Sequence, residues 1–484
     1  FSSELEEIPE KFRDVFNLVA WNSTKACISM MTDTINITVE SIMLSRTSTR
    51  NAISAYGIVI GLVDAEFTLS SGAALAQNII TSGKLGKGDF IGAGRALHRN
   101  ILGLMVYTTV YLLFASFSHS IFLELTQNQG LTNEIFKFLF LGTVNYSLSG
   151  LTNAFKNFEY AFHEFDASVW ISACKVVLEL TLASIVLLIY RQGLPVLGLV
   201  MVTTSSLEVL AHIIYCATHH EIRRSFIRPT LESFHGMWRD FKMYLTMSII
   251  GSSEWLAGDL TTFLGASLPM VQMTSHSLAA SIVYSFWGFP VSIGITMSSY
   301  IAFLIGARRK ELIPTFLYGG VAVSFMIGLA SFVIILLVAL FGTHLITADL
   351  EVQRYLKHIL IIGASYKILE MKVGTLGFSL RALGKQNEVL AVSLGGVLLI
   401  GFPLQIAMLR YTNLGVYGLW IGYGCNLVFV VICYTVLFQK ALDSIKRGEE
   451  IPSPGLSPKR MRSPGLSPKA QRAFFTESIQ NKSI

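Results

Sequence analysis

The chain has 484 residues, of which 52% are hydrophobic and only 14% are charged, and its formal net charge is +6 at pH 7. Soluble domains carry about 25% charged residues, so this composition excludes an ordinary soluble protein and indicates one that crosses a membrane many times. None of the five cysteines has CxxC spacing, so neither a zinc site nor a disulfide framework is supported.

Long apolar runs divide the chain into helices that are each long enough to cross a membrane, for which about 20 residues are needed. Twelve runs predict an all-α membrane protein, at residues 17–45, 54–83, 99–122, 134–155, 168–190, 194–217, 240–267, 277–305, 313–341, 355–381, 388–409 and 415–440. The predicted organisation is an N-terminal segment (1–16), an N-lobe of six helices (17–217), a linker (218–239), a C-lobe of six helices (240–440) and a tail (441–484).

The tail contains Ser453-Pro-Gly-Leu-Ser-Pro-Lys459 and a copy of it at 463–469. Proline and glycine at this density cannot pack a core, so we expect a disordered basic tail near anionic headgroups, with phosphorylation of the Ser-Pro pairs as the alternative. The chain begins at Phe1, and a cleaved upstream presequence is one interpretation of that start.

Lysines and arginines are distributed unequally between the two sets of predicted loops. If the N-terminus lies in the cytoplasm, fifteen basic residues fall inside, at 84, 87, 95, 99, 156, 223, 224, 228, 239, 242, 308, 309, 310, 381 and 385. Only five fall outside, at 46, 50, 191, 354 and 410. The positive-inside rule therefore places both termini on the cytoplasmic side, and we read the net positive charge as topology rather than as nucleic-acid binding.

Two loops about 220 residues apart resemble each other. Leu85-Gly-Lys-Gly-Asp89 is echoed by Ile305-Gly-Ala-Arg-Arg309, and each follows a long apolar helix. Duplicated halves are common in secondary transporters, whose substrate sites lie between the repeats. The repeat therefore indicates transport.

Several carboxylates fall inside the predicted helices, where a charge is costly and needs a partner or a function. Asp33 and Glu40 are seven residues apart and share one face of their helix, Glu254 and Asp259 share another helix, and Glu370 is flanked by Lys367 and Lys372. A buried carboxylate can exchange a proton near neutral pH and can bind a cation. The alternative is a structural role in which each carboxylate is tied to a lysine, an arginine or the backbone.

Other polar and aromatic side chains in the helices allow two interpretations. Lys175 and Glu179 are spaced to pair with each other, whereas Glu208 has no partner visible in its own helix. His212 either faces a cavity or is satisfied within the bundle. Likewise Trp255, Trp287 and Tyr284 either stack on a flat cation or pack between helices and lipid; we favour packing.

Six motifs follow one another along the chain: Val39-Glu-Ser-Ile-Met-Leu-Ser-Arg46, Leu85-Gly-Lys-Gly-Asp89 with Ala93-Gly-Arg-Ala-Leu97, Glu254-Trp255 with Asp259, Pro290 with Ser298 and Ile305-Gly-Ala307, Leu380-Arg-Ala-Leu-Gly-Lys-Gln386, and Gly415-Val-Tyr-Gly-Leu-Trp-Ile-Gly422. In this order and spacing they resemble the motifs of the multidrug and toxic compound extrusion (MATE) transporters over about residues 15–440. The chain looks like a divergent eukaryotic-type member. Glu40 stands where the family has Asp, and Arg308 follows Gly306-Ala307 where the family has Gly.

The resemblance implies two six-helix lobes around a V-shaped central cavity, and antiport of organic cations or small metabolites against protons or sodium by alternating access. We expect Glu254 and Glu370 to bind the cation and couple transport, with Asp259 assisting, and Glu40 with Asp33 to form a second, N-lobe site that is a candidate for sodium. We expect no enzymatic activity, no cofactor, no other metal, no nucleic-acid partner and a monomer in the lipid bilayer. Alternatives are a non-transporting subunit of a larger membrane complex and a lipid-linked oligosaccharide flippase.

Overall fold

The computed structural model describes residues 8–265 and 267–449, which form helices and loops with no strand among them. Each of the twelve predicted spans coincides with one helix or with consecutive helical segments, so the all-α prediction is confirmed. The repeated Ser-Pro sequences of the tail lie outside the described residues.

The N-lobe consists of α2 (Phe12–Thr47), α3 (Arg50–Leu85), α4 (Phe90–Thr126), α5 (Gln129–Ala161), α6 (Asp166–Ser184) with the π-helical turn η1 (Ile185–Ile189), and α7 (Leu194–Thr218). Helix α4 begins nine residues before the predicted start at 99. The side chain of Asp89 caps it by accepting a hydrogen bond from the Gly92 amide at 2.8 Å. Its first turns carry Arg95 and Arg99, which made this stretch resemble a loop in the sequence.

The linker holds two short segments, α8 (His220–Arg223) and η2 (Leu231–Phe234). The C-lobe follows with α9 (Met237–Gly265), α10 (Met270–Tyr284), α11 (Gly288–Gly306), η3 (Lys310–Leu312), α12 (Ile313–Leu337), η4 (Val338–Gly342), α13 (Thr343–Ile346), α14 (Leu350–Ser365), α15 (Lys367–Ala382), α16 (Gln386–Gly395), η5 (Gly396–Gly401), α17 (Phe402–Tyr411) and α18 (Val416–Lys446). Helix α18 thus continues six residues past the predicted membrane boundary at 440.

Two predicted spans of the C-lobe are interrupted. Residues 285–287 separate α10 from α11, and Tyr366 separates α14 from α15. The ammonium of Lys367 donates a hydrogen bond to the Val283 carbonyl oxygen at 2.8 Å, which satisfies a backbone acceptor next to the first break. Non-helical backbone at membrane depth is tolerated only where protein or a cavity satisfies it. Tyr366 at the second break is buried, whereas Ser285 at the first break is exposed.

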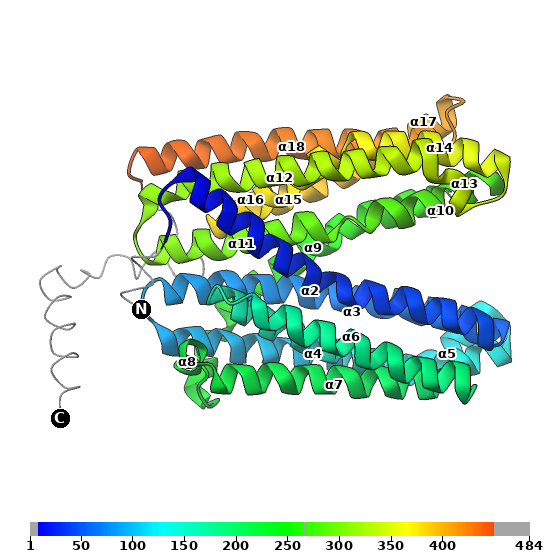
Figure 1. Cartoon of the computed structure of the whole chain (residues 1–484), viewed down its shortest axis with the longest axis horizontal. Helices are drawn as coiled ribbons and strands as arrows, with labels where there is room; N and C mark the ends of the chain where they lie inside the picture. The colour runs from blue at the N-terminus through cyan, green and yellow to red at the C-terminus, as the bar shows by residue number, and fades with distance from the viewer. Residues whose placement is uncertain (1–7, 266, 450–484) are drawn as a thin grey trace, which may run out of the picture.

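The two lobes are connected by a helix that contacts both. The beginning of α2 lies over the C-lobe, and its later part runs along the N-lobe (Figure 1). It packs against α11 and α12 of the C-lobe and against α6 of the N-lobe. Between the lobes, α3 also packs against α9 and α11. Helix α2 begins and α18 ends at the same end of the molecule, which we call the termini end (Figure 1).

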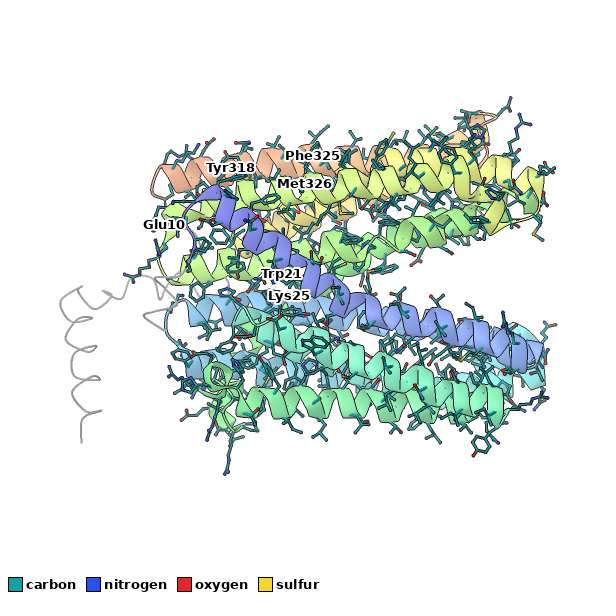
Figure 2. All side chains as sticks on the ribbon, in the orientation of Figure 1. Glu10, Trp21, Lys25, Tyr318, Phe325 and Met326 are labelled. Carbon is teal, nitrogen blue, oxygen red and sulfur yellow. The ribbon has the colours of Figure 1, made fainter. Side chains whose placement is uncertain are left out.

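The outer faces of the bundle are apolar. Trp21, Tyr318, Phe325 and Met326 are exposed and project away from the helices (Figure 2). Among the described residues, eight helical stretches are long and apolar enough to cross a membrane. The spans that fall short are α2, α5, α9 and α14–α15, and buried charges occur on them, as at Glu40, Glu159, Asp240 and Glu370, as well as on α4, α6 and α7. These more polar helices contact protein partners, because intramembrane charges face the bundle interior.

The two repeated loops meet at the termini end. Ser82 of α3 and Ser299 of α11 share a hydrogen bond of 3.1 Å between their hydroxyl oxygens. Ser299 also donates to the carbonyl oxygen of Tyr160, at the end of α5, at 2.9 Å. We call this set the repeat contact. Equivalent ends of the two halves therefore close the interface between the lobes on this side.

Candidate functional site

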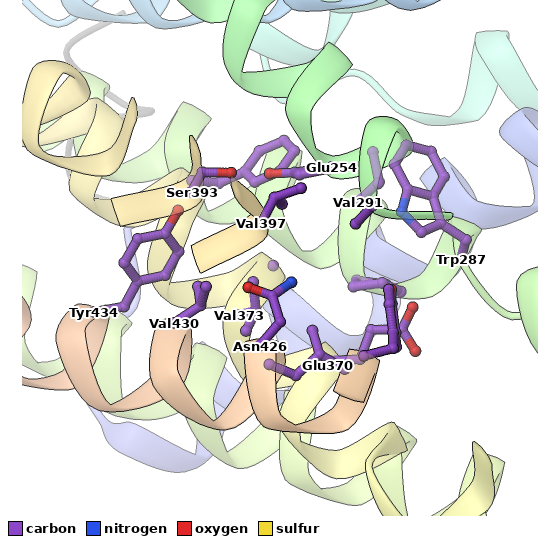
Figure 3. Close-up of a pocket in the computed structure, with 16 residues that line it drawn as sticks. Glu254, Trp287, Val291, Glu370, Val373, Ser393, Val397, Asn426, Val430 and Tyr434 are labelled. Atoms are coloured by element: carbon purple, nitrogen blue, oxygen red, sulfur yellow. The ribbon is translucent and has the colours of Figure 1, made fainter. Parts of the chain in front are cut away.

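A pocket in the C-lobe brings together two of the carboxylates that the sequence singled out. Glu254 comes from α9 and Glu370 from α15, and both line it (Figure 3). Trp287, at the break before α11, and Tyr423, Asn426 and Tyr434 of α18 are also in its wall. Glu254 and Glu370 are 116 positions apart in the sequence, so their meeting depends on the packing of the lobe.

Glu254 is held by a buried arginine. The guanidinium of Arg381, which is 2% exposed, donates to Oε1 of Glu254 at 2.5 Å and lies 4.5 Å from the centre of the Phe378 ring. A charge-assisted bond of this kind holds the carboxylate in place while its other oxygen remains available to the pocket. The sequence contained Arg381 in a motif but did not show that it pairs with Glu254.

Glu370 is held in the same way by a buried lysine. The Lys367 ammonium is fully buried and lies 2.5 Å from Oε2 of Glu370. The sequence placed Lys367 beside Glu370, and the structure selects it over Lys372 as the ion-pair partner. Each carboxylate of the pocket therefore has its own internal cation, and a bound substrate cation or proton would compete with that cation for the carboxylate.

Uncharged groups complete the wall. Among the described residues, Oδ1 of Asn426 is buried without a hydrogen-bond partner, and the amide group of Asn426 points into the pocket (Figure 3). A buried carbonyl oxygen without a donor is an acceptor available to a cationic ligand. Sequence analysis missed Asn426, and its signal was a single amide within the apolar sequence of α18.

Asp259 does not line the pocket, although the sequence proposed that it assists Glu254. It is an exposed residue of α9. Five residues turn a helix by about 500°, which leaves the two side chains about 140° apart around the axis. Asp259 instead lies close enough to Asp64 of α3 for the two carboxylates to interact electrostatically.

Glu40 is fully buried in the N-lobe, away from the C-lobe pocket. Its Oε2 accepts a hydrogen bond from the Tyr56 hydroxyl at 2.9 Å, and Glu179 of α6 is its electrostatic neighbour. The side chain of Asp33 lies outside what the structure describes, so its predicted partnership with Glu40 stays a prediction. No cluster of three or more histidine, cysteine or acidic side chains suited to a metal occurs within the described part of the chain.

Three predictions about other polar residues have clear outcomes. Lys175 and Glu179 pair at 3.3 Å, as expected. Glu208 is not isolated, because the Lys156 ammonium of α5 lies 3.2 Å from it. Of the two interpretations of His212, the structure supports burial within the bundle: the side chain is fully buried between helices, and its Nδ1 lies 2.7 Å from Oε1 of Glu159. The sequence could not reveal the last two pairs, since their partners come from another helix.

Aromatic residues of the site pack against each other. The rings of Trp255 and Trp287 have their centroids 5.0 Å apart. Trp255 therefore fits the packing interpretation, whereas Trp287 both packs and lines the pocket.

Comparisons with known proteins agree with this architecture. Residues 248–407 match the MatE family model, and this segment includes both Glu254 and Glu370. Multidrug and toxin extrusion protein 1 of Oryctolagus cuniculus is 22% identical over 253 residues, which are 51% of this chain and 44% of that protein. The human protein of the same name is 24% identical over 198 residues, 41% of this chain and 35% of that protein. The aligned part thus spans less than half of the length of these relatives.

Solved structures resemble nearly the whole chain. The eukaryotic MATE transporter AtDTX14 has a TM-score of 0.81 at 16% identity, covering 90% of this chain and 99% of that one. A transporter of the MOP superfamily from Pyrococcus furiosus, described as having a binding pocket of reversed polarity, has a TM-score of 0.79 at 14% identity, covering 89% of this chain and 97% of that one. At these identities the likeness shows the fold alone, and the pocket's own residues must indicate the substrate.

Proposed function

We propose that this chain, which contains a MATE family domain and has the fold of the MATE transporters, is a secondary antiporter that exports small organic cations in exchange for protons. The observation that carries the proposal is the pocket shared by Glu254 and Glu370, in which Trp287 and Asn426 stand beside the two carboxylates. Carboxylates attract a cation, an aromatic face binds it by cation–π interaction, and an amide oxygen adds a dipole.

Competition for the carboxylates would couple the two fluxes. An organic cation that enters the pocket contacts Glu254 or Glu370. It thereby partly replaces Arg381 or Lys367 as the cationic partner of that carboxylate. Protonation removes the negative charge of the carboxylate, so the cation loses its counter-charge and leaves. Each ligand thus weakens the binding of the other, which is the linkage that antiport requires. The two lobes would present the site alternately to the two sides of the membrane.

The charge of the pocket weighs against the flippase alternative. A pyrophosphate group needs cations that are free to bind it, whereas Arg381 and Lys367 are each paired with a carboxylate of the same pocket. The subunit alternative makes a different prediction, since a structural subunit would keep the pocket but would not move a cation.

Uptake into liposomes tests the proposal. The purified full chain would be reconstituted, and accumulation of radiolabelled tetraethylammonium would be followed with an acidic interior, with and without a sodium gradient. The variants are Glu254→Gln and Glu370→Gln, which keep the side-chain shape and remove the charge. Glu388→Gln is the matched control, because Glu388 pairs with Lys385 outside the pocket.

We expect the pH gradient to drive accumulation in wild type and in the control, and each pocket variant to lose at least tenfold. Accumulation that requires the sodium gradient and not the pH gradient would identify sodium as the coupling ion. Absence of cation transport under both gradients, by a chain that is folded and inserted, would reject the antiporter in favour of a structural role.

A further inference from the structure

The N-lobe contains a second set of buried ionisable side chains, separate from the C-lobe pocket. Its members come from α2, α5, α6 and α7 and are each at most 7% exposed; they are Glu40, Lys156, Glu159, Lys175, Glu179, Glu208 and His212. The proposed transport cycle makes no use of the end of this set around Glu159 and His212, and no charge of this kind is kept in a membrane bundle without a partner or a function.

The set forms a polar stripe along the helices. On α6 its positions are Ser168, Ser172, Lys175 and Glu179, which recur every three or four residues on one face, and on α7 they are Thr204, Glu208, His212 and Cys216. Eleven residues of helix span ~16 Å. The stripe therefore runs from Glu179 in the interior of the lobe to Glu159 and His212 near the termini end.

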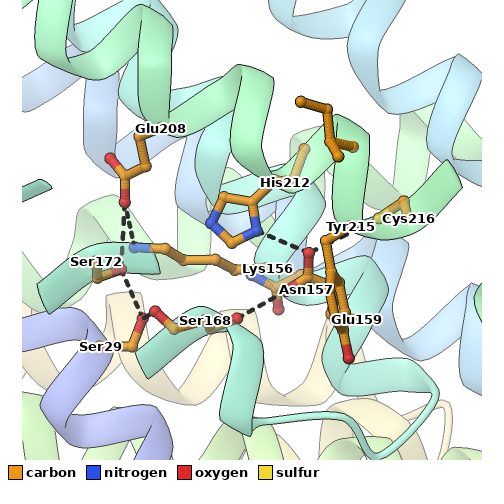
Figure 4. A network of polar contacts seen from close by, with 12 residues as sticks. Ser29, Lys156, Asn157, Glu159, Ser168, Ser172, Glu208, His212, Tyr215 and Cys216 are labelled. Carbon is orange, nitrogen blue, oxygen red and sulfur yellow. Dashed lines mark hydrogen bonds and ion pairs between the residues drawn. The ribbon is translucent and has the colours of Figure 1, made fainter. Parts of the chain in front are cut away.

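Glu159 and His212 form a close acid–base pair at that end. The Oε1 atom of Glu159 lies 2.7 Å from Nδ1 of His212, and its Oε2 atom accepts a hydrogen bond from the Ser168 hydroxyl at 2.9 Å (Figure 4). Both side chains are fully buried. Within the described part of the chain, Nε2 of His212 has no hydrogen-bond partner. When Nδ1 carries the proton that is bonded to the carboxylate, Nε2 has a free lone pair.

Other titratable groups surround the pair. Lys156 lies one turn before Glu159 on α5 and contacts Glu208 at 3.2 Å, while the Ser172 hydroxyl donates to the same oxygen of Glu208 at 3.2 Å. The Cys216 thiol of α7 lies 3.7 Å from Glu159. Tyr160 of α5 and Tyr215 of α7 are also electrostatic neighbours of Glu159. From α2 the cluster receives the uncharged Ser29, which bonds Ser172 (Figure 4).

The charges of the described set do not balance. It contains four carboxylates, at 40, 159, 179 and 208, and two ammonium groups, at 156 and 175. With all of these ionised and the imidazole neutral, its net charge is 2 − 4 = −2. A net charge buried in a lobe is strongly disfavoured, so the set is stabilised when it takes up protons. His212 offers the unoccupied lone pair to receive one.

We propose that Glu159 and His212 form a proton-binding site of the N-lobe, which loads a proton on Nε2 of His212. The proton adds to the free lone pair, and the resulting imidazolium keeps its Nδ1–H bond to the Glu159 carboxylate, so no bond to carbon changes and no other reactant is needed. The inference rests on the proposed function only in assigning this proton to the transport cycle.

The position of the site connects it to the interface between the lobes. Tyr160 follows Glu159 directly, and its carbonyl oxygen accepts the hydrogen bond from Ser299 in the repeat contact. Loading the pair changes the charge beside a residue that joins α5 to the C-lobe. The site can therefore bias the closing of the termini end when it takes up a proton, in addition to storing that proton.

Nitrogen NMR of the full chain with labelled histidine tests proton binding without relying on transport. The Nε2 signal of His212 would be assigned from its loss in His212→Gln and followed between pH 5 and 9. We expect the signal of a protonated Nε2 at the acidic end of the series and of a free lone pair at the alkaline end, and we expect Glu159→Gln to reduce the protonated fraction, because the carboxylate stabilises the imidazolium. A His212 signal that keeps one protonation state throughout would overturn the site.

Transport assays then test whether the transport cycle uses this proton site. Proton-driven uptake of tetraethylammonium should fall at least tenfold in Glu159→Gln and His212→Gln, while counterflow exchange without a pH gradient stays within about twofold of wild type. Ser205→Ala is the control, since Ser205 is buried on α7 but bonds Asn145 outside the cluster. Unchanged proton-driven uptake in both variants would remove the site from the cycle. If wild type transports no cation but His212 titrates, the antiporter fails and the proton site stands.

Discussion

Gly86 and Gly306 occupy equivalent positions in the two repeated loops and pack against each other across the interface between the lobes. A Cβ on Gly86 would lie 2.1 Å from the Phe303 carbonyl oxygen, and a Cβ on Gly306 would lie 2.3 Å from the Gly83 carbonyl oxygen. The contact is reciprocal, since Gly83 and Phe303 each precede their own glycine by three residues. Backbones can approach this closely only where both positions lack a side chain.

Alanine at either glycine should therefore open the termini end. Gly86→Ala and Gly306→Ala place a methyl group against backbone, which cannot yield as a flexible side chain does, at a cost of about 1–3 kcal/mol to the closed arrangement. We expect the ratio of closed to open molecules to fall by roughly fivefold to 150-fold. Spin labels on exposed Lys87 and Arg308, replaced by cysteine, would report the distance between the loops by double electron–electron resonance.

Gly103 provides the control for this experiment. A Cβ at Gly103 meets nothing within 4 Å, so Gly103→Ala should leave the distance distribution as in wild type. A distribution for Gly86→Ala that matches that of Gly103→Ala would show that the glycine contact does not hold this end closed.

The ion pair between Glu254 and Arg381 should be strongly coupled. Arg381→Met leaves the Glu254 carboxylate without its cation, and Glu254→Gln leaves a buried guanidinium without its anion, so each single variant should be less stable than wild type. The double variant removes both charges and should recover much of the loss. Thermal unfolding of all four proteins gives the coupling energy, which we expect at about 1–3 kcal/mol. Additive losses would mean that the two charges do not stabilise each other.

The sequence predicted the helices well because each membrane span requires a long run of apolar residues. All twelve runs correspond to helical segments. The start of α4 was predicted too late, because the charged residues Arg95 and Arg99 lie in its first turns. The breaks at 285–287 and at Tyr366 were missed, since no proline or glycine lies within either break to mark it in the sequence. Hydropathy reports the environment of a residue and not the continuity of its backbone hydrogen bonds.

The candidate site was predictable only in part. Carboxylates stand out in an apolar helix, so Glu254, Glu370 and Glu40 could be selected from the sequence alone. Lys367 was visible beside Glu370, but the partners of Glu254 and Glu40 were not, because Arg381 and Tyr56 reach them from other helices. Glu159 was overlooked because it lies beyond the predicted end of its span at 155, in a part of α5 that is polar yet fully buried.

Arg99 should anchor the linker and the C-lobe to α4. Its guanidinium pairs with the fully buried Asp240 of α9 and donates to the carbonyl oxygens of Ser233 and His235, both at 2.7 Å. Arg99→Ala leaves the buried Asp240 carboxylate with only the half-exposed Arg239, whose Nε lies 3.2 Å from Oδ1, and should cost up to about 3–5 kcal/mol.

Arg99→Lys should recover little of that stability, because an ammonium cannot reproduce the planar fork that reaches three acceptors. Thermal unfolding checks both variants, and a lysine variant as stable as wild type would show that charge alone is needed. The exposed pair of Arg95 and Glu232 supplies the control, since Arg95→Ala removes an ion pair at the surface, where such pairs contribute little.

Asp89 should make the start of α4 sensitive to acid. Burial alone would raise the pKa of Asp89, but the Lys84 ammonium at 2.9 Å and the Gly92 amide favour its charged form, and the pKa of this loop carboxyl lies below its usual value. Because the folded pKa is the lower one, the cap contributes its full stability above the unfolded value of about 4 and loses it as the pH falls through the folded value.

Protection of the amides of residues 90–95 from hydrogen exchange, corrected for the intrinsic rate, should therefore stay constant near neutral pH and decline below about pH 4. Asp89→Ala should show reduced protection at every pH, equivalent to about 0.5–2 kcal/mol, whereas Asp89→Asn should keep the cap and lose the acid sensitivity. An asparagine variant that declines with acid as wild type does would place the sensitivity in another group.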